Sequence, residues 1–296
     1  MLKKISHVAH LRAHIYMHLS VLLWGLTGVL GRGISLREGA LVWWRLLIVT
    51  ITIGAHIAII GKSFRIGRKK LIQMSAIGAL LTIHWLLFYG AIKFSNISLT
   101  LSCLSTTSLF TALIEPAMYR RPVDFLQLMC SILGCVGVSL IFFDSSGYAF
   151  GMMLALLAAF TGSFFNILNK QVVTDLPAEI VSFYEMLGGL VTLTAFMPLY
   201  QYLTNDFSFF PLRGDWVLLI VLSVLCTHVT LVLSLASLKY LSAFTLNLAI
   251  NLEPVYGIAL AFLFYNEDKF LGAGFYAGSG LVLLSVVLHA IFSSRK

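Results

Sequence analysis

Glu253 places a carboxyl group near the middle of a long apolar segment, and Pro254 follows it directly. Proline lacks a backbone N–H, so it leaves the carbonyl of Ile250 without its helical partner. A carboxyl group beside an interrupted helix, near the middle of a membrane, is typical of transporter binding sites. We expect Glu253 either to take up protons or to bind a substrate amine. The alternative is a protonated structural residue that satisfies the freed carbonyl.

Other polar side chains also fall within apolar segments. A central charge costs roughly 2.5–3.5 kcal/mol there on insertion scales, so such groups usually face the protein interior. His84 and His228 lie at mid-depth and either titrate near neutral pH or remain neutral structural residues. Asn247 and Asn251 are four residues apart on one helix face, which suits a cavity wall or hydrogen bonds between helices. Further candidates for a cavity that binds an amphipathic solute are Trp24, Thr106, Thr107, Ser163, Asn166 and Tyr256.

Arg45 and Glu185 occupy matching places early in the second and seventh apolar segments. Because these segments start from opposite sides of the membrane, a rise of 1.5 Å per residue separates the two groups by about 12–15 Å along the membrane normal. We expect separate vestibule charges, with Arg45 on the outer side and Glu185 on the inner side. Snorkelling of each charge to its nearest interface is the alternative.

Ten apolar segments must position these residues. The 296-residue chain is 59% hydrophobic and only 11% charged, whereas soluble domains contain about 25% charged residues. A spanning helix needs about 20 apolar residues. The predicted fold is therefore an all-α integral membrane protein. Its predicted spans are residues 14–32, 40–60, 71–93, 97–119, 124–143, 149–170, 180–203, 216–238, 243–265 and 270–291.

The basic residues are distributed unevenly over the connections between these spans. With the N-terminus inside, the inner segments hold fourteen Lys and Arg residues and the outer loops hold five. The positive-inside rule therefore predicts both termini in the cytoplasm, in a multi-pass protein of the bacterial inner membrane. The net charge of +8 follows this topology and does not indicate nucleic-acid binding.

A short repeated motif, which we call the sequence echo, divides the chain into halves. Ala91-Ile92-Lys93-Phe94 recurs as Ser237-Leu238-Lys239-Tyr240, about half the chain later. A half that crosses the membrane five times must run in opposite directions in its two copies. The echo therefore predicts two inverted five-helix repeats, residues 1–143 and 149–296, joined near Asp144.

Several motifs resemble EamA-type members of the drug/metabolite transporter superfamily. They are Leu22-Leu23-Trp24-Gly25, Trp44-Arg45-Leu46, the Lys93 and Lys239 signatures, Asn251-Leu252-Glu253-Pro254-Val255-Tyr256, and Asn266-Glu267. The resemblance covers essentially the whole chain. It implies a bundle of ten spans, built from two inverted repeats, that moves small organic solutes. One departure is Ser108, which stands in register with Pro254 where the family often has proline.

Cofactors and catalysis are not indicated. His7, His10, His14 and His18 share one helix face but no acidic or Cys ligand accompanies them, which favours an interfacial helix face over a metal site. The four cysteines are expected to be small buried residues. The chain has no Walker-type phosphate loop and no protease signature. We expect no cofactor and no enzymatic activity.

The predicted function is a secondary-active carrier or exporter of small organic metabolites that works by alternating access. Its expected partners are the lipid bilayer, a small-molecule solute and, for coupling, protons. A nucleotide-sugar or sugar-phosphate carrier is the alternative within transport, although it would need several cavity cations. An intramembrane metal-dependent enzyme is the alternative from another class. The small-residue side of the tenth span, at Gly274 and Gly278, suits packing within the monomer or a homodimer seam, so the oligomeric state stays open.

Overall fold

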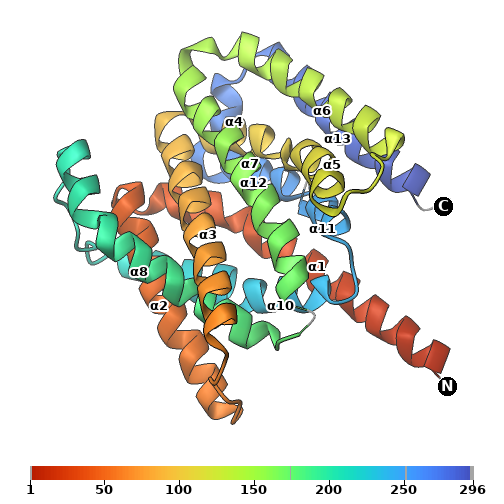
Figure 1. The fold of residues 1–296 in the computed structure, drawn as a ribbon. Coiled ribbons are helices and arrows are strands. Elements are labelled where there is room, and N and C mark those ends of the chain that lie inside the picture. Colours follow the sequence, from red (N-terminus) through yellow and green to blue (C-terminus); the bar gives the residue numbers. More distant parts are fainter. Residues whose placement is uncertain (1, 174, 251, 294–296) are drawn as a thin grey trace.

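The computed structural model describes residues 2–173, 175–250 and 252–293, and every regular element among them is a helix (Figure 1). The helices are α1 (Leu2–Gly33), α2 (Glu38–Ile59), α3 (Arg68–Phe94), α4 (Ile97–Leu104), α5 (Thr107–Tyr119), α6 (Phe125–Asp144), α7 (Ala149–Val172), α8 (Ala178–Thr204), α9 (Asp215–Ile220), the π-helix η2 (Val221–Val229), α10 (Thr230–Leu238), α11 (Ala243–Ile250), α12 (Glu253–Tyr265) and α13 (Ala273–Ser293). Two short 3₁₀ turns, η1 (Ser146–Tyr148) and η3 (Glu267–Phe270), lie between them.

Helix length and apolar composition agree with a membrane protein. Eight helical stretches in the described part of the chain are long and apolar enough to cross a bilayer, and Glu253–Tyr265 and Ala273–Ser285 are shorter apolar helices. Together with α11, they occupy the ten segments predicted from the sequence. The all-helical integral membrane class is therefore confirmed.

Two of the ten predicted segments are broken in the middle. The ninth is interrupted between α11 and α12, and Pro254 lies in the first turn of α12, where its missing N–H costs nothing. The fourth is interrupted between α4 and α5 without a proline. There the hydroxyls of Thr106, Thr107 and Ser108 bond to carbonyls three residues earlier, at 2.8, 2.6 and 3.2 Å. Such bonds compete with the helical ladder. This second break was not predicted.

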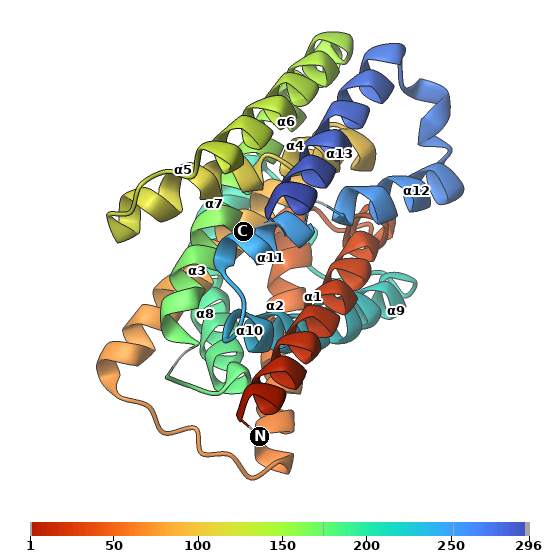
Figure 2. The ribbon, with the colours of Figure 1, turned by 90° about the vertical axis from the view of Figure 1, so that its right-hand side faces the viewer.

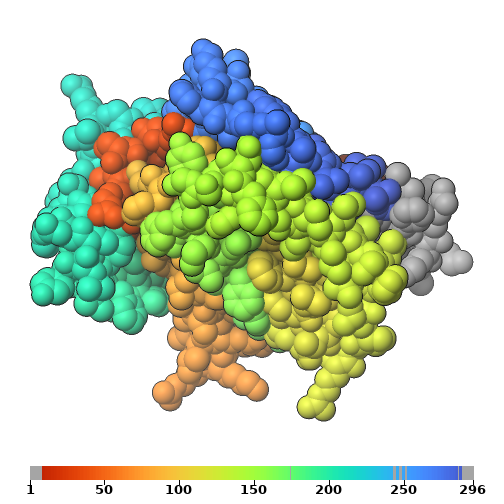
Figure 3. Space-filling view, turned by 90° about the horizontal axis from the view of Figure 1, so that it is seen from above, coloured from red at the N-terminus to blue at the C-terminus, as the bar shows by residue number. Residues whose placement is uncertain are grey.

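The packing joins the two halves of the chain pairwise. α6 packs on α13, α4 on α12 and α2 on α8, and the contact of α1 with α10 has a counterpart in the contact of α3 with α7. Figures 1 and 2 both show α6 and α13 side by side. Gly137 and Gly278 make that contact close, because a Cβ on either one would collide with the carbonyl of the other. Seen from above, the teal region around α8 lies on the side of the molecule opposite the yellow α6 (Figure 3).

The connections between spans fall into two groups. One group holds residues 34–37, 95–96, 145–148, 205–214 and 266–272; we call it the outer side, after the predicted topology. The first of these connections contacts the neighbouring helix ends: Arg37 Nη1 donates to Thr204 O at the end of α8 at 3.2 Å, and Lys93 Nζ, near the end of α3, donates to Ile34 O at 3.3 Å. The other group, the inner side, holds residues 60–67, 120–124, 173, 175–177 and 239–242, and the pair Lys62–Glu179 joins the first of these connections to the start of α8.

Candidate functional site

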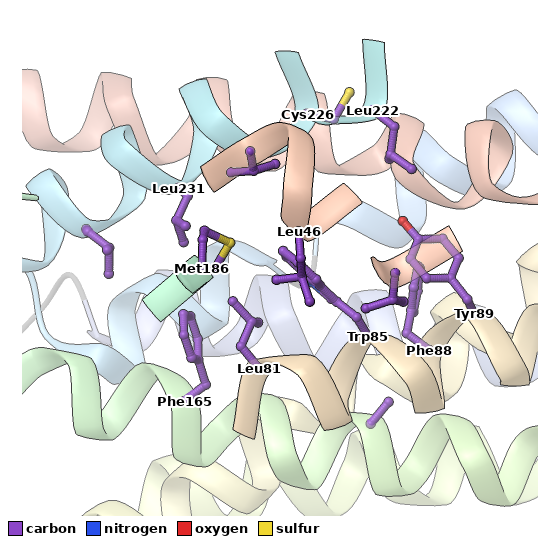
Figure 4. Close-up of a cluster of buried hydrophobic side chains, with 14 of the residues drawn as sticks. Leu46, Leu81, Trp85, Phe88, Tyr89, Phe165, Met186, Leu222, Cys226 and Leu231 are labelled. Atoms are coloured by element: carbon purple, nitrogen blue, oxygen red, sulfur yellow. The ribbon is translucent and has the colours of Figure 1, made fainter. Parts of the chain in front are cut away.

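A cavity of about 100 Å³ lies where the two halves of the chain meet. Helices α1, α2, α3, α5, α7, α10 and α12 all contribute to its wall, as does η2. Its apolar part includes Leu81, Trp85 and Phe88 of α3 together with Phe165 of α7 and Leu231 of α10. Figure 4 shows these side chains converging from their helices. Its polar part is lined by Thr27, Arg45, His84, Thr107, Asn166, Thr227, Thr230 and Glu253.

Arg45 is held in the cavity wall by three neighbours. Its side chain is only 2% exposed. Nε donates to Thr227 Oγ1 at 2.8 Å, and Nη1 donates to Tyr89 OH at 2.7 Å. The guanidinium carbon lies 3.8 Å from the centroid of the Trp85 ring, which is a cation–π contact. Two of the five N–H groups of the guanidinium are thereby used, and the rest donate to no group among the described residues.

Glu253 begins α12 and is 6% exposed. Its position at a helix N-terminus suits a negative charge. Its carboxyl group interacts electrostatically with Arg45, yet in the described part of the chain the two form no ion pair within 4 Å. Both groups line the same cavity. This differs from the expectation of an isolated outer-vestibule charge at Arg45, because Tyr89, Thr227 and Trp85 hold the guanidinium inside instead of letting it snorkel.

Four further predicted residues line this cavity: Trp24, His84, Thr107 and Asn166. His84 Nδ1 lies 2.7 Å from the carbonyl oxygen of Ala158, so that nitrogen carries the proton in this tautomer. Sequence reasoning missed Thr27, Thr227 and Thr230. Thr27 lies one helical turn after Trp24, a predicted lining residue, so i+3 spacing was an available signal there. No predicted lining residue lies one turn from Thr227 or Thr230, so the sequence carried no such signal for them.

Other predicted residues lie elsewhere. Thr106 and Ser163 donate to the carbonyls of Cys103 and Phe160 at 2.8 and 2.7 Å. Tyr256 is 36% exposed and packs beside Gly25 of α1. Glu185 is 0% exposed and lies apart from the cavity, not in an open vestibule. Asn251 is outside the described residues, as is the side chain of Asn247.

His228 belongs to a pair that the sequence did not suggest. Its Nε2 lies 3.1 Å from Nδ1 of His56, which comes from α2. The π-helix places His228 here, because its wider turn shifts the register of η2 relative to the flanking α-helical turns. No set of three or more His, Cys, Asp or Glu side chains in the described residues is grouped so that it could hold a metal ion.

Comparison with known proteins identifies the family. The model of the EamA-like transporter family matches residues 11–143 and again residues 149–291. The chain belongs to the EamA-like transporter family. It is 22% identical to the uncharacterized transporter YxxF of Bacillus subtilis (strain 168), over 92% of this chain and 89% of that protein. An uncharacterized transporter of Archaeoglobus fulgidus is 26% identical over 68% of this chain and 69% of its own length.

The EamA resemblance drawn from the motifs is thus confirmed, and the chain is a multi-pass membrane transporter by family. A solved crystal structure has the same fold, with a TM-score of 0.71 at 15% identity, over 96% of this chain and 99% of that one. At that identity the likeness concerns the fold alone. The names of these two relatives give no substrate.

Proposed function

We propose that this EamA-family chain is a secondary-active carrier of a small zwitterionic organic solute, such as an amino acid, and that it works by alternating access. The observation that carries the proposal is the joint presence of Arg45 and Glu253 in one small cavity without an ion pair between them. Buried charges usually have a partner. A zwitterion supplies the counter-charge for both.

The binding mode follows from the donors and acceptors of the cavity. The free N–H groups of Arg45 match a carboxylate, which guanidinium binds with two parallel hydrogen bonds. The carboxylate of Glu253 accepts from an ammonium group. Trp85, Phe88 and Phe165 surround the carbon skeleton of the solute, while Asn166 and the threonines can accommodate a polar side group. A cavity of about 100 Å³ restricts the solute to a small one.

Alternating access rests on symmetry. In the proposed topology, residues 1–143 and 149–296 are inverted repeats of five spans each, with both termini in the cytoplasm of a bacterial cell. The reciprocal contacts α1–α10 and α3–α7 support this arrangement, because the first and third spans of each repeat pack on the third and first of the other. Two such repeats can exchange conformations and expose one midplane site to either side.

The alternatives fit the cavity less well. Nucleotide sugars and sugar phosphates call for several cations, and Arg45 is the one Lys or Arg in the described cavity wall. An intramembrane enzyme is disfavoured by the family assignment. We therefore retain the carrier of a zwitterion as the conclusion.

A thermal-shift screen tests the proposed substrate class. Purified protein is heated with L-amino acids, with the amines formed by their decarboxylation, with the corresponding carboxylic acids, and with sugar phosphates. A ligand of the native state raises the unfolding temperature. We expect the zwitterions to stabilise the protein more than either single-charge analogue. Stabilisation by sugar phosphates and by no amino acid would contradict the proposal.

Two variants test which residue binds the carboxylate of the solute and which binds its ammonium group. Arg45→Gln should abolish the advantage of an amino acid over its decarboxylated amine, and Glu253→Gln should abolish the advantage over the carboxylic acid. Glu253→Gln should still fold, since an amide can hydrogen-bond in place of the acid. Glu179→Gln is the matched control, because Glu179 lies on the inner side and pairs with Lys62 away from the cavity. Its screen should match that of the wild type.

A further inference from the structure

Glu185 is a fully enclosed carboxyl group that the cavity does not use. It lies on α8 with 0% exposure, and neither carboxyl oxygen has a hydrogen-bond partner among the described residues. The helix cannot easily turn this group outward. Gly78 of α3 packs so closely that a Cβ there would overlap the backbone carbonyl of Glu185. The side chain is therefore held in place by the contact between α3 and α8.

Asn169 of α7 is the polar neighbour of this carboxyl group. The two side chains lie near enough to interact, although their polar atoms are not within hydrogen-bond distance in this conformation. Asn169 is likewise 0% exposed, and neither its amide nitrogen nor its amide oxygen has a close partner in the described part of the chain. Asn166 lies three residues earlier on the same helix, and therefore on nearly the same face, and it lines the central cavity. The Glu185–Asn169 pair thus lies next to the cavity along α7.

The charged groups on the surrounding helices are engaged elsewhere. On α3, His84 contacts the carbonyl of Ala158. On α2, Arg45 bonds to Tyr89 and Thr227, and His56 pairs with His228. On α7, Lys170 Nζ donates to the carbonyls of Leu238 and Leu241. α10 contains no titratable side chain. No ion pair within the described residues reaches Glu185.

An ionised carboxylate in this position would be a buried charge without a counter-charge, which costs several kcal/mol. A neutral carboxylic acid avoids that cost, and its O–H can donate to the amide oxygen of Asn169. The enclosed conformation therefore accommodates the carboxyl group with its proton bound. The amide of Asn169 can hydrogen-bond to either form of the acid, but only the neutral form leaves no uncompensated charge in this enclosed position.

We propose that Glu185 is the site that carries the coupling proton of this transporter, with Asn169 as its hydrogen-bond acceptor. When the pathway opens to water, the carboxylate takes a proton from hydronium or returns one to water. When the site is enclosed, the proton travels with the conformational change. The enclosed state favours the protonated form of Glu185 over the ionised form. Because the proton thus binds one conformation better than the other, its binding can drive the conformational change. This inference rests on the proposed carrier function.

Infrared spectroscopy tests the proton independently of transport. A protonated carboxyl group has a C=O stretching band that a carboxylate lacks. We expect this band in the wild type at neutral pH, and its loss in Glu185→Gln. It should persist in Glu179→Gln, the control on the same helix. Asn169→Leu removes the acceptor and should move the band to the higher frequency of a free acid. The Asn169→Leu variant also tests the assignment of the band if Glu185→Gln fails to fold. A spectrum unchanged in both variants would overturn the proposal.

Proteoliposomes test the coupling. They contain a pH-sensitive dye, and an equimolar mixture of L-amino acids is the probe. The wild type should change the internal pH as amino acids move, and Glu185→Gln should lose that signal while it still exchanges labelled amino acids. The wild type could move amino acids without a pH change, or only in the presence of Na⁺. Either result would overturn the proposal that Glu185 carries the coupling proton, but not the proposal that the protein is an amino-acid carrier. Failure of the wild type to move any amino acid would contradict the proposed solute, whereas the infrared band would still report on Glu185.

Discussion

The outer and inner sides of the molecule are fastened in different ways. On the outer side, the carboxylate of Glu267 is buried, pairs with Arg32, and accepts from the N–H groups of Ile97 and Ser98 at 3.1 and 2.9 Å. On the inner side, Lys62 pairs with Glu179 at 2.9 Å and Lys70 with Asp175 at 2.6 Å, and neither pair has a fully buried member.

This difference predicts which side is harder to open from the conformation seen here. Asn96 caps α4 by accepting from Leu99 N–H, and Glu267 accepts from the N–H groups of the first two residues, so opening the outer side would leave those two N–H groups without an acceptor. The inner pairs already exchange with water and give up little when they part. The inner side also has a cleft of about 400 Å³, bordered by Arg12, Lys62, Glu179 and Lys239. In this conformation the outer side is therefore held closed more strongly than the inner side.

Glu267→Gln should have the largest effect on stability. The amide cannot serve Arg32, Ile97 and the Ser98 hydroxyl as one carboxylate does, and charge-assisted hydrogen bonds are worth about 1.5–3 kcal/mol each. Because Arg32 is half-exposed, we expect a loss of about 2–3 kcal/mol in total. Thermal unfolding of the purified protein in detergent measures it. Asp268→Asn, at the exposed neighbouring residue, is the control and should leave the unfolding temperature unchanged. Equal stability of the two variants would refute the fastening role of Glu267.

Asp215→Asn should cost less. Asp215 accepts from the backbone N–H and the hydroxyl of Ser35 at 2.8 and 2.5 Å, and from the N–H of Leu212 at 2.9 Å. An asparagine oxygen can keep one or two of these bonds, so we expect a loss of about 1–2 kcal/mol. The same unfolding experiment applies, with Asp206→Asn as the comparison on the same loop. A variant as stable as the wild type would show that the loop before α9 does not depend on Asp215.

Much of the fold could be predicted from the sequence, for physical reasons. Apolar segments of about 20 residues leave few options in a membrane, and Pro254 marked the break before α12. The break between α4 and α5 could not be predicted in the same way. It depends on Thr106, Thr107 and Ser108 bonding back to carbonyls, and hydroxyl side chains do this in continuous helices as well.

The candidate site was harder to predict than the fold. Depth along a span is readable from residue number, but the direction of a long side chain is not. Arg45 was therefore placed by its Cα in an outer vestibule, whereas Tyr89 and Thr227 draw its guanidinium into the cavity wall. The π-helical turn is similarly invisible in the sequence. It brings His228 to His56, a contact between the second and eighth spans that no local pattern announces.

Cysteine labelling should make the two sides respond in opposite directions. Leu36 is buried on the outer side, and Ala236 borders the inner cleft. With all four native cysteines replaced, Leu36→Cys should react slowly with a polar thiol reagent and Ala236→Cys faster. Adding Glu267→Gln should raise the labelling rate at position 36 and lower it at position 236, because one equilibrium links the two sides. Rates that rise at both positions would indicate a continuous pore.

The inner pair should show the smallest effect and complete the contrast. Lys62→Glu and Glu179→Lys each place like charges together, and an exposed pair is worth about 0.2–1 kcal/mol. Each single change should lower the stability by no more than that, and the double exchange should restore it because the opposite charges meet again. In 1 M salt the effect should vanish, since the screening length falls to about 3 Å. The loss in Glu267→Gln should largely survive the same salt, because its hydrogen bonds are buried. A cost at the inner pair that is large and insensitive to salt would mean that both sides are fastened by desolvated charge.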